Sequence, residues 1–296
     1  MSQPLFRLLE ARPDTYQHWY QQGHYLWERG QHEDALFCYD RALEHQPQDY
    51  RAWYGRGKTL EALGRYREAV ESYQQAVQAR PQDYWAWYNQ GYLALLELQD
   101  YERAAHCFQQ ALAVAPEDYW SRYRLGETWR QWGQLEEAIA CFERLLATHP
   151  EDFWAWYRRG DALRQADRYL EALQSYEQAL ALRPDDYWGW RQRGGLFRRL
   201  GWWQAAIASY RQALAVEPED ENALYAQACC YAAAGDRTGA LRTLGWVLAL
   251  DAATYGPRAW AEPVFAPWHQ DPDWQQLLPP QPPTLDATAP APAPQP

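Results

Sequence analysis

The sequence predicts an all-α solenoid, a fold in which short helix-turn-helix units stack one upon the next. Apolar residues spaced by three and four indicate two helices in each unit, with a glycine inside the first. A unit of about this length cannot bury its apolar face alone, so a fixed period indicates stacked repeats. The period itself is marked by prolines spaced 34 or 35 residues apart, at Pro13, Pro47, Pro81, Pro116, Pro150, Pro184 and Pro218.

The chain is expected to divide into four parts. Residues 1–13 have the pattern of a second repeat helix and should form a capping helix, which is half a repeat. Residues 14–251 should form the array of seven units. Residues 252–278 contain Tyr255, Trp260, Val264, Phe265, Trp268 and Trp274 among prolines and should form an irregular cap that ends in a short helix. The alternative for this segment is a tether that binds elsewhere or folds back into the groove. Residues 279–296 are rich in proline and alanine and should form a disordered tail.

The second unit shows how each repeat is expected to fold. Asp49 can cap the first helix by accepting backbone N–H bonds. Trp53 and Gly57 share one helical face, and Gly57 lets the partner helix come close. Gly64 should end the first helix in a left-handed cap, and Pro81 should stop the second.

This set of residues resembles the tetratricopeptide repeat (TPR) family. The pattern is Trp53, Gly57, Ala69, Tyr73, Ala76 and Pro81, and neighbouring units repeat it, beginning with Trp19, Trp87 and Trp190. The resemblance implies antiparallel helix pairs in a right-handed superhelix whose first helices line a concave groove. The aromatic openings, Asp-Tyr-Trp-Ala-Trp-Tyr, are similar to those of TPR proteins common in cyanobacteria, some of which act as assembly factors.

Two units depart from this pattern. The third unit has one extra residue between Gly91 and Tyr101, which predicts a local change of helix length or superhelical pitch. The seventh unit has lost its aromatic opening and is rich in alanine, as a degenerate terminal repeat should be.

Composition narrows the partner class. The net charge of −11 argues against nucleic acid, because phosphate binding needs a positive field. Bilayer insertion is not expected, because the chain has no apolar run near the ~20 residues that a span needs. The N-terminal residues lack the pattern of a signal peptide, so we expect a cytoplasmic protein. Peripheral association with a membrane through a partner stays open.

No motif for catalysis or a cofactor is found. The sequence has no phosphate-binding glycine loop, zinc signature or nucleophile motif, so we expect no enzyme activity, cofactor or metal. Cys38, Cys107 and Cys141 share one repeat position that holds serine in other units, which indicates small packed side chains rather than reactive thiols.

An aromatic stripe is predicted to face the groove. We number the first helix of each unit from the residue after the capping aspartate, which is position one. Positions two and five then lie on the same side of the helix, three residues apart. They hold Trp85 with Tyr88, Trp120 with Tyr123, Trp154 with Tyr157, and Trp188 with Arg191. Trp, Tyr and Arg are the usual anchors of protein interfaces, so we predict a partner-binding site here. The alternative is that the tryptophans pack on one another and only stiffen the array.

Arginines follow on the same face. They are Arg124 and Arg158 at position six, and Arg130, Arg164 and Arg198 at position twelve. Glu127 and Asp161 can pair with these arginines inside their own helices, which would consume positive charge. The helix of Arg198 has Gly195 instead of an acid, so Arg198 is predicted to be the charged anchor.

These observations favour a protein-interaction scaffold, adaptor or assembly factor that binds a peptide or helical segment of another protein. One binding mode known in the family is a two-carboxylate clamp with Lys at position five and Asn at position nine, and it is absent here. Two alternatives stay open. One is single-stranded nucleic-acid binding by aromatic stacking and arginine. The other is a self-associating structural scaffold.

Overall fold

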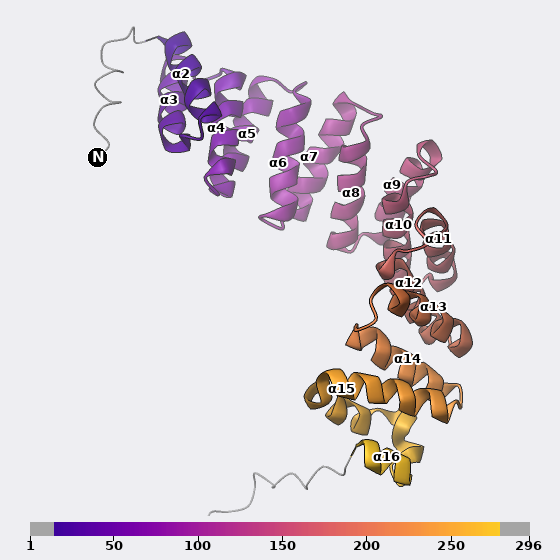
Figure 1. The fold of residues 1–296 in the computed structure, drawn as a ribbon. Coiled ribbons are helices and arrows are strands. Elements are labelled where there is room, and N and C mark those ends of the chain that lie inside the picture. Colours follow the sequence, from indigo (N-terminus) through magenta and orange to yellow (C-terminus); the bar gives the residue numbers. More distant parts are fainter. Residues whose placement is uncertain (1–14, 279–296) are drawn as a thin grey trace, which may run out of the picture. The chain divides into compact units, whose positions relative to one another are not determined.

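The structure, a computed structural model, describes residues 15–278, and the regular elements in that range are all helices (Figure 1). The all-α, repeated helix-turn-helix prediction is therefore confirmed. The predicted capping helix of residues 1–13 and the predicted disordered tail of residues 279–296 lie outside the described residues.

Each repeat is a pair of helices joined by a short turn. The first helices are α2 (Tyr16–Glu28), α4 (Tyr50–Ala62), α6 (Tyr84–Leu96), α8 (Tyr119–Trp132), α10 (Phe153–Gln165), α12 (Tyr187–Arg199) and α14 (Glu221–Ala233). The second helices are α3 (His32–His45), α5 (Tyr66–Ala79), α7 (Tyr101–Val114), α9 (Leu135–Thr148), α11 (Tyr169–Leu182), α13 (Trp203–Val216) and α15 (Arg237–Ala261).

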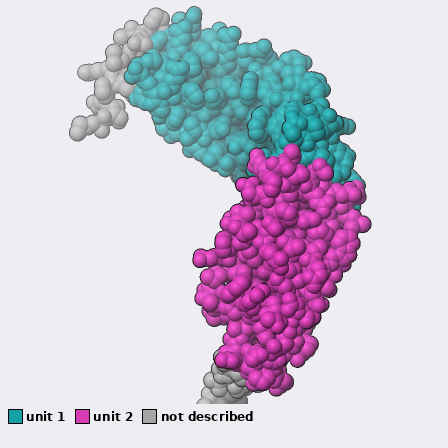
Figure 2. Space-filling model, turned by 45° about the vertical axis from the view of Figure 1, so that its right-hand side comes forward, with its two compact units in different colours: residues 1–168 teal, residues 169–296 magenta. Residues whose placement is uncertain are grey.

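The chain forms two compact units, coloured separately in Figure 2. Residues 1–168 form the N-terminal unit, which contains α2 to α10, and residues 169–296 form the C-terminal unit, which contains α11 to α16. The boundary falls between the two helices of the fifth repeat, and the two units are described separately below.

Aspartates begin the first helices, as the sequence predicted. In the second to seventh repeats, the side chain of the residue before the first helix accepts a backbone N–H three residues on. These residues are Asp49, Asp83, Asp118, Asp152, Asp186 and Asp220. Thr15 does the same for α2. The caps satisfy N–H groups that no helical carbonyl can reach.

The extra residue of the third repeat lies in a turn. Helix α6 has 13 residues, the same as α4, so the expectation of a changed helix length was wrong, and the change of superhelical pitch stays a prediction. The turn after α6 is instead one residue longer, and Gln99 takes the positive φ of 54° there. Gly64 has the corresponding φ of 72° in the preceding repeat. A turn absorbs an insertion at lower cost than a helix, whose apolar stripe would rotate out of register.

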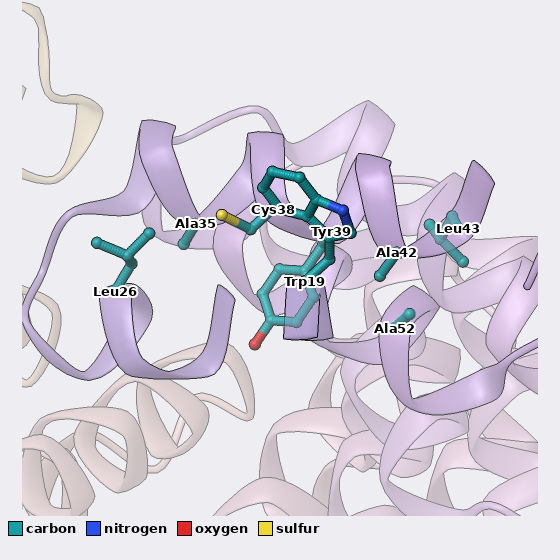
Figure 3. Packing of buried hydrophobic residues seen from close by; sticks show 8 residues of the cluster. All are labelled: Trp19, Leu26, Ala35, Cys38, Tyr39, Ala42, Leu43 and Ala52. Carbon is teal, nitrogen blue, oxygen red and sulfur yellow. The ribbon is translucent and has the colours of Figure 1, made fainter. Parts of the chain in front are cut away.

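Aromatic rings of the second helices fill the space that the first-helix glycines leave. In the first repeat the cluster contains Trp19, Leu26 and Tyr39, all buried (Figure 3). A Cβ atom on Gly23 would lie 3.2 Å from the Tyr39 ring. Trp53 adds a bond to the preceding turn, since its indole N–H donates to the Pro47 carbonyl at 2.7 Å. The repeat residues that carry the family resemblance are therefore packing residues.

Residues 252–278 are more regular than expected. Helix α15 is broken at Asp251 (φ −148°, ψ 83°), where the array was predicted to end. A short 3-10 helix, η1 (Pro263–Trp268), and α16 (Pro272–Leu277) follow. Phe265 and Trp274 are fully buried, and η1 packs on α14 and α15. Apolar burial against the last repeat explains this order in a proline-rich segment.

Candidate functional site

Three of the four predicted tryptophans stand on the first helices of the N-terminal unit. Helix α8 contacts both α6 and α10, so equivalent positions of these helices lie on one surface. Trp85, Trp120 and Trp154 are 60%, 56% and 46% exposed. We call these three residues the tryptophan row. Large apolar side chains are usually buried, so repeated exposure at one position is a feature that packing does not explain.

The tyrosines at position five contribute less surface than expected. The rings of Tyr88 and Tyr123 lie 5.8 Å and 5.9 Å from Phe108 and Phe142 of the second helices. Tyr157 is only 6% exposed. Position five therefore turns toward the second helix of the same repeat. Its tyrosines pack against the tryptophans of the row and add little exposed surface to it.

Each tryptophan of the row is held by its own helix. The Trp85 ring lies 5.0 Å from Tyr84 and 6.3 Å from Tyr88, both in edge-to-face geometry. Trp120 repeats this arrangement, 5.0 Å from Tyr119 and 6.4 Å from Tyr123. Edge-to-face contacts orient a ring while leaving much of its surface in solvent. The row is therefore a set of oriented, exposed indoles.

The position-one tyrosines form a link that the sequence analysis missed. The Tyr84 hydroxyl donates to the Asp118 carboxylate at 2.8 Å, and that of Tyr119 donates to Asp152 at 2.6 Å. Each aspartate also caps its own helix, so one carboxylate joins two repeats. The signal was present as Asp-Tyr pairs at the repeat period. Nothing in the sequence indicated that each tyrosine reaches the aspartate of the next repeat.

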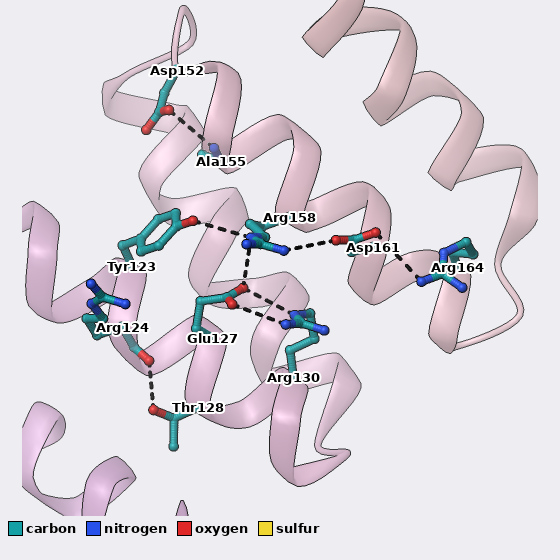
Figure 4. Close-up of polar contacts among 10 residues, drawn as sticks. All are labelled: Tyr123, Arg124, Glu127, Thr128, Arg130, Asp152, Ala155, Arg158, Asp161 and Arg164. Atoms are coloured by element: carbon teal, nitrogen blue, oxygen red, sulfur yellow. Dashed lines mark hydrogen bonds and ion pairs between the residues drawn. The ribbon is translucent and has the colours of Figure 1, made fainter. Parts of the chain in front are cut away.

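The arginines beside the row form a bonded network (Figure 4). Arg130 pairs with Glu127 of its own helix at 3.1 Å, the pairing within one helix that the sequence spacing allowed. Arg158 reaches Glu127 of the neighbouring repeat at 3.5 Å and Asp161 at 3.2 Å. Arg164 pairs with Asp161 at 3.7 Å. Both carboxylates are buried, at 6% exposure. Much of the positive charge at this face is therefore neutralised.

Arg158 and Arg124 differ in how their charge is stabilised. Burial opposes the charged form of Arg158, but Glu127 and the Tyr123 hydroxyl outweigh it and raise the pKa of Arg158. The Arg124 guanidinium lies 5.2 Å from the Tyr92 ring centre, in a cation–π contact rather than an ion pair with Glu127. Arg158 thus stays charged and serves to hold two repeats together.

The remaining predicted residues lie in the C-terminal unit. Trp188 is 53% exposed, and the Arg191 guanidinium lies 5.4 Å from its ring centre. Arg191 also pairs with Asp220 at 3.7 Å. Arg198 is exposed and has no ion pair within the described part of the chain, in line with the missing local acid at Gly195. These residues belong to the C-terminal unit, whereas the tryptophan row belongs to the N-terminal unit.

Other chemistry has little structural basis in the described residues. Between residues 15 and 278, no group of three or more His, Cys, Asp or Glu is arranged to hold a metal ion. None of the helices described there has both the length and the apolarity to cross a bilayer. Burial raises the pKa of the Cys38 and Cys107 thiols to about 12, which suits packed rather than reactive side chains.

Stacked helix pairs with an ordered aromatic face define a helical-repeat protein of the α-solenoid class. The tetratricopeptide repeat family model matches residues 20–84, 56–97, 88–140, 130–187 and 192–260. The chain therefore belongs to the tetratricopeptide repeat family. A search of the curated proteins gave no match.

Solved structures of the family share the fold. YrrB, described as a TPR protein with an unusual peptide-binding site, is 22% identical with a TM-score of 0.55 over 64% of this chain and 97% of YrrB. The C-terminal part of a TPR repeat-containing protein from Cytophaga hutchinsonii is 18% identical, with a TM-score of 0.67 over 79% of this chain and 96% of its own. MamA is 22% identical, with a TM-score of 0.54 over 58% of this chain and 93% of its own.

Proposed function

We propose that this protein is an interaction scaffold, acting as an adaptor or assembly factor, that binds a peptide segment of another protein. The tryptophan row, Trp85, Trp120 and Trp154, is the proposed contact surface. Trp188, Arg191 and Arg198 are proposed to supply further contacts from the C-terminal unit. We propose no catalytic role and a cytoplasmic location.

The main support for this proposal is that the same repeat position exposes a tryptophan in each of α6, α8 and α10. If these residues only stiffened the array, burial against one another would be favourable, and about half of each side chain would not stay in water. A preformed surface lowers the ordering cost of binding, and tryptophan is one of the residues enriched at the energetic hot spots of protein interfaces. That YrrB is a peptide-binding member of the family supports the same class of ligand.

The structure gives less support to single-stranded nucleic acid. Arg130, Arg158 and Arg164 already pair with buried carboxylates, so they offer little free charge to phosphates. Self-association through the row is the remaining alternative. It predicts that the apparent molecular mass of the wild type rises with protein concentration. The row variant described next should then have a lower apparent mass than the wild type at the same concentration.

The test is an affinity capture with the full chain and a variant carrying Trp85→Ala, Trp120→Ala and Trp154→Ala. The matched control carries Trp202→Ala and Trp246→Ala, which remove tryptophans that are 50% and 55% exposed elsewhere. A nuclease-treated lysate should yield a partner that the control retains and the row variant loses. A peptide of that partner should then bind the purified chain with weak dependence on salt. Equal retention by the row variant would show that the row is not the contact surface.

A further inference from the structure

The C-terminal unit contains a small arginine-lined pocket outside the tryptophan row. Its volume is about 270 Å³, and its walls come from α12, α13, α14 and the end of α15. The residues that matter here are Arg191, Arg198, Asn222, Tyr225, Arg258 and Glu262. We call this cavity the arginine pocket. Arg258 and Glu262 lie beyond Asp251, so the pocket exists only because the C-terminal segment folds onto the last repeat.

The three arginines are held in different ways. Arg191 pairs with Asp220 at 3.7 Å. The Arg258 guanidinium lies over the Tyr225 and Tyr255 rings, 4.6 Å and 5.2 Å from their centres. A contact with aromatic rings leaves the N–H donors of a guanidinium available for bidentate recognition of a carboxylate. Arg198 is exposed at the pocket wall and has no ion pair among the described residues.

Tyr225 supports the wall of the pocket. It is only 4% exposed, and the Arg258 guanidinium lies over its ring. Its hydroxyl oxygen is buried beside the Cys229 thiol, and burial, followed by Cys229 and Glu262, raises the pKa of Tyr225, so the hydroxyl stays neutral. Tyr225 therefore holds the Arg258 guanidinium at the pocket wall.

The local charge matches a single negative charge. Arg191, Arg198 and Arg258 face two carboxylates, Asp220 on Arg191 and Glu262 in the wall, which leaves one positive charge in excess. Glu262 would repel a doubly charged phosphate more than a carboxylate. A cavity of about 270 Å³ is also smaller than a typical drug-sized ligand site and suits one residue of a polypeptide.

We infer that the arginine pocket binds one carboxylate group of a partner polypeptide, from either its C-terminus or an acidic side chain. The inference rests on the proposed function for the contacts of Arg191 and Arg198, but it does not involve the tryptophan row, so the pocket and the row can fail separately. Arg198 and Arg258 would donate to the carboxylate oxygens. The site differs from the two-carboxylate clamp of the family, because two of its residues come from outside the repeats.

The test uses the full chain labelled with ¹⁵N-arginine and follows the guanidinium Nε–H signals by NMR. N-acetyl-leucine represents a C-terminal carboxylate, and N-acetyl-aspartate α-N-methylamide represents a side-chain carboxylate. N-acetyl-leucinamide is the neutral control, and inorganic phosphate is the competing anion. Saturable shifts of the Arg198 and Arg258 signals with one or both carboxylates, and none with the amide, are expected. The carboxylate that binds more tightly identifies the source.

Variants assign the effect to the pocket. Arg198→Gln should weaken carboxylate binding by about tenfold, since a charge-assisted hydrogen bond is lost. The control is Arg199→Gln, the same charge change one residue on, where Arg199 instead donates to Tyr169 at 2.7 Å. The triple variant of the tryptophan row should bind the carboxylate like the wild type. Three results would overturn the inference: no saturable carboxylate binding, equal weakening by both arginine variants, or tighter binding of phosphate than of either carboxylate.

Discussion

The hydroxyl of Tyr84 donates a hydrogen bond of 2.8 Å to Asp118, which also caps α8 by accepting the Ser121 N–H at 2.6 Å. One carboxylate thus satisfies the start of its own helix and binds the preceding repeat. Because Tyr119 and Asp152 repeat the arrangement, the link is a property of the array and not of one turn. Stability in a solenoid depends on such nearest-neighbour interfaces.

Removing either partner of this link should destabilise the N-terminal unit. Tyr84→Phe is expected to cost about 1 kcal/mol, the net value of one hydrogen bond. Asp118→Ala should cost up to about 2 kcal/mol, because the helix cap is lost as well. The double variant should cost less than the sum, since both changes remove the same bond. Urea unfolding measures these values. Tyr88→Phe, on the same helix but without such a bond, should be nearly neutral, and strict additivity would contradict the link.

Truncation of two nearby tryptophans of α6 should lower the free energy of unfolding by very different amounts. Trp85→Ala should cost less than about 1 kcal/mol, because the side chain is 60% exposed. Trp87→Ala should cost about 3–5 kcal/mol, because Trp87 is 9% exposed and donates to the Pro81 carbonyl at 2.9 Å. The comparison is made by thermal and urea unfolding. A large loss for Trp85→Ala would return the tryptophan row to a packing role.

Glu127 should be the most sensitive member of the arginine network. Glu127→Gln removes the charge that Arg130 and Arg158 share, and it is expected to cost about 3 kcal/mol since both guanidinium groups are partly buried. The matched control is Glu143→Gln, which breaks a pair with Arg159 in which the carboxylate is 50% exposed, and it should cost below about 1 kcal/mol. Similar losses for the two variants in urea unfolding would show that the network contributes no more than a surface pair.

Acid should release the C-terminal segment through Asp271. The bond from Arg237 holds the pKa of Asp271 below its ordinary 3.8, so this carboxylate is charged above that value in the folded and unfolded chains alike. Its stabilising contribution is therefore present above pH 3.8 and disappears as the pH falls through the lowered pKa. Hydrogen exchange of residues 263–278, measured relative to the intrinsic amide rate, which itself slows in acid, should accelerate in that acidic range.

The variant Arg237→Gln should show the same faster exchange at neutral pH, since Asp271 and Asp273 lose their shared partner at 2.6 Å. Arg242→Gln, in the same helix but stacked on the exposed Trp246, is the control and should leave the exchange of residues 263–278 unchanged. If acid fails to accelerate exchange in the wild type, another contact must hold the segment.

Features set by neighbouring residues could be read from the sequence. The Asp caps, the glycine turns and the repeat boundaries depend on residues within one turn of a helix, so their signals are local. The pairing of Arg130 with Glu127 was also predictable from their spacing in one helix. The exposure of Trp85 and Trp120 at position two followed from the helical period as a prediction of the outward face.

Features that join different repeats could not be read in this way. Arg158 reaches Glu127, and Arg237 reaches Asp271, across 31 and 34 residues of chain. Tyr157 is buried although Tyr88 and Tyr123 at the same helix position are only partly buried, because side-chain depth depends on the helix that packs over it. Arg258 and Tyr225 carried no motif, and only folding of the C-terminal segment brings them to one cavity.

By itself, the sequence determined the period, the helix pairs and the residues that begin and end them, because each depends on short-range hydrogen bonding and steric preference. It also determined that one repeat position carries a tryptophan in four consecutive units. The tertiary structure alone decided which of those helix faces stay in solvent, which arginines are neutralised and where a pocket forms. These outcomes depend on packing between elements far apart in the chain, for which the local pattern holds no information.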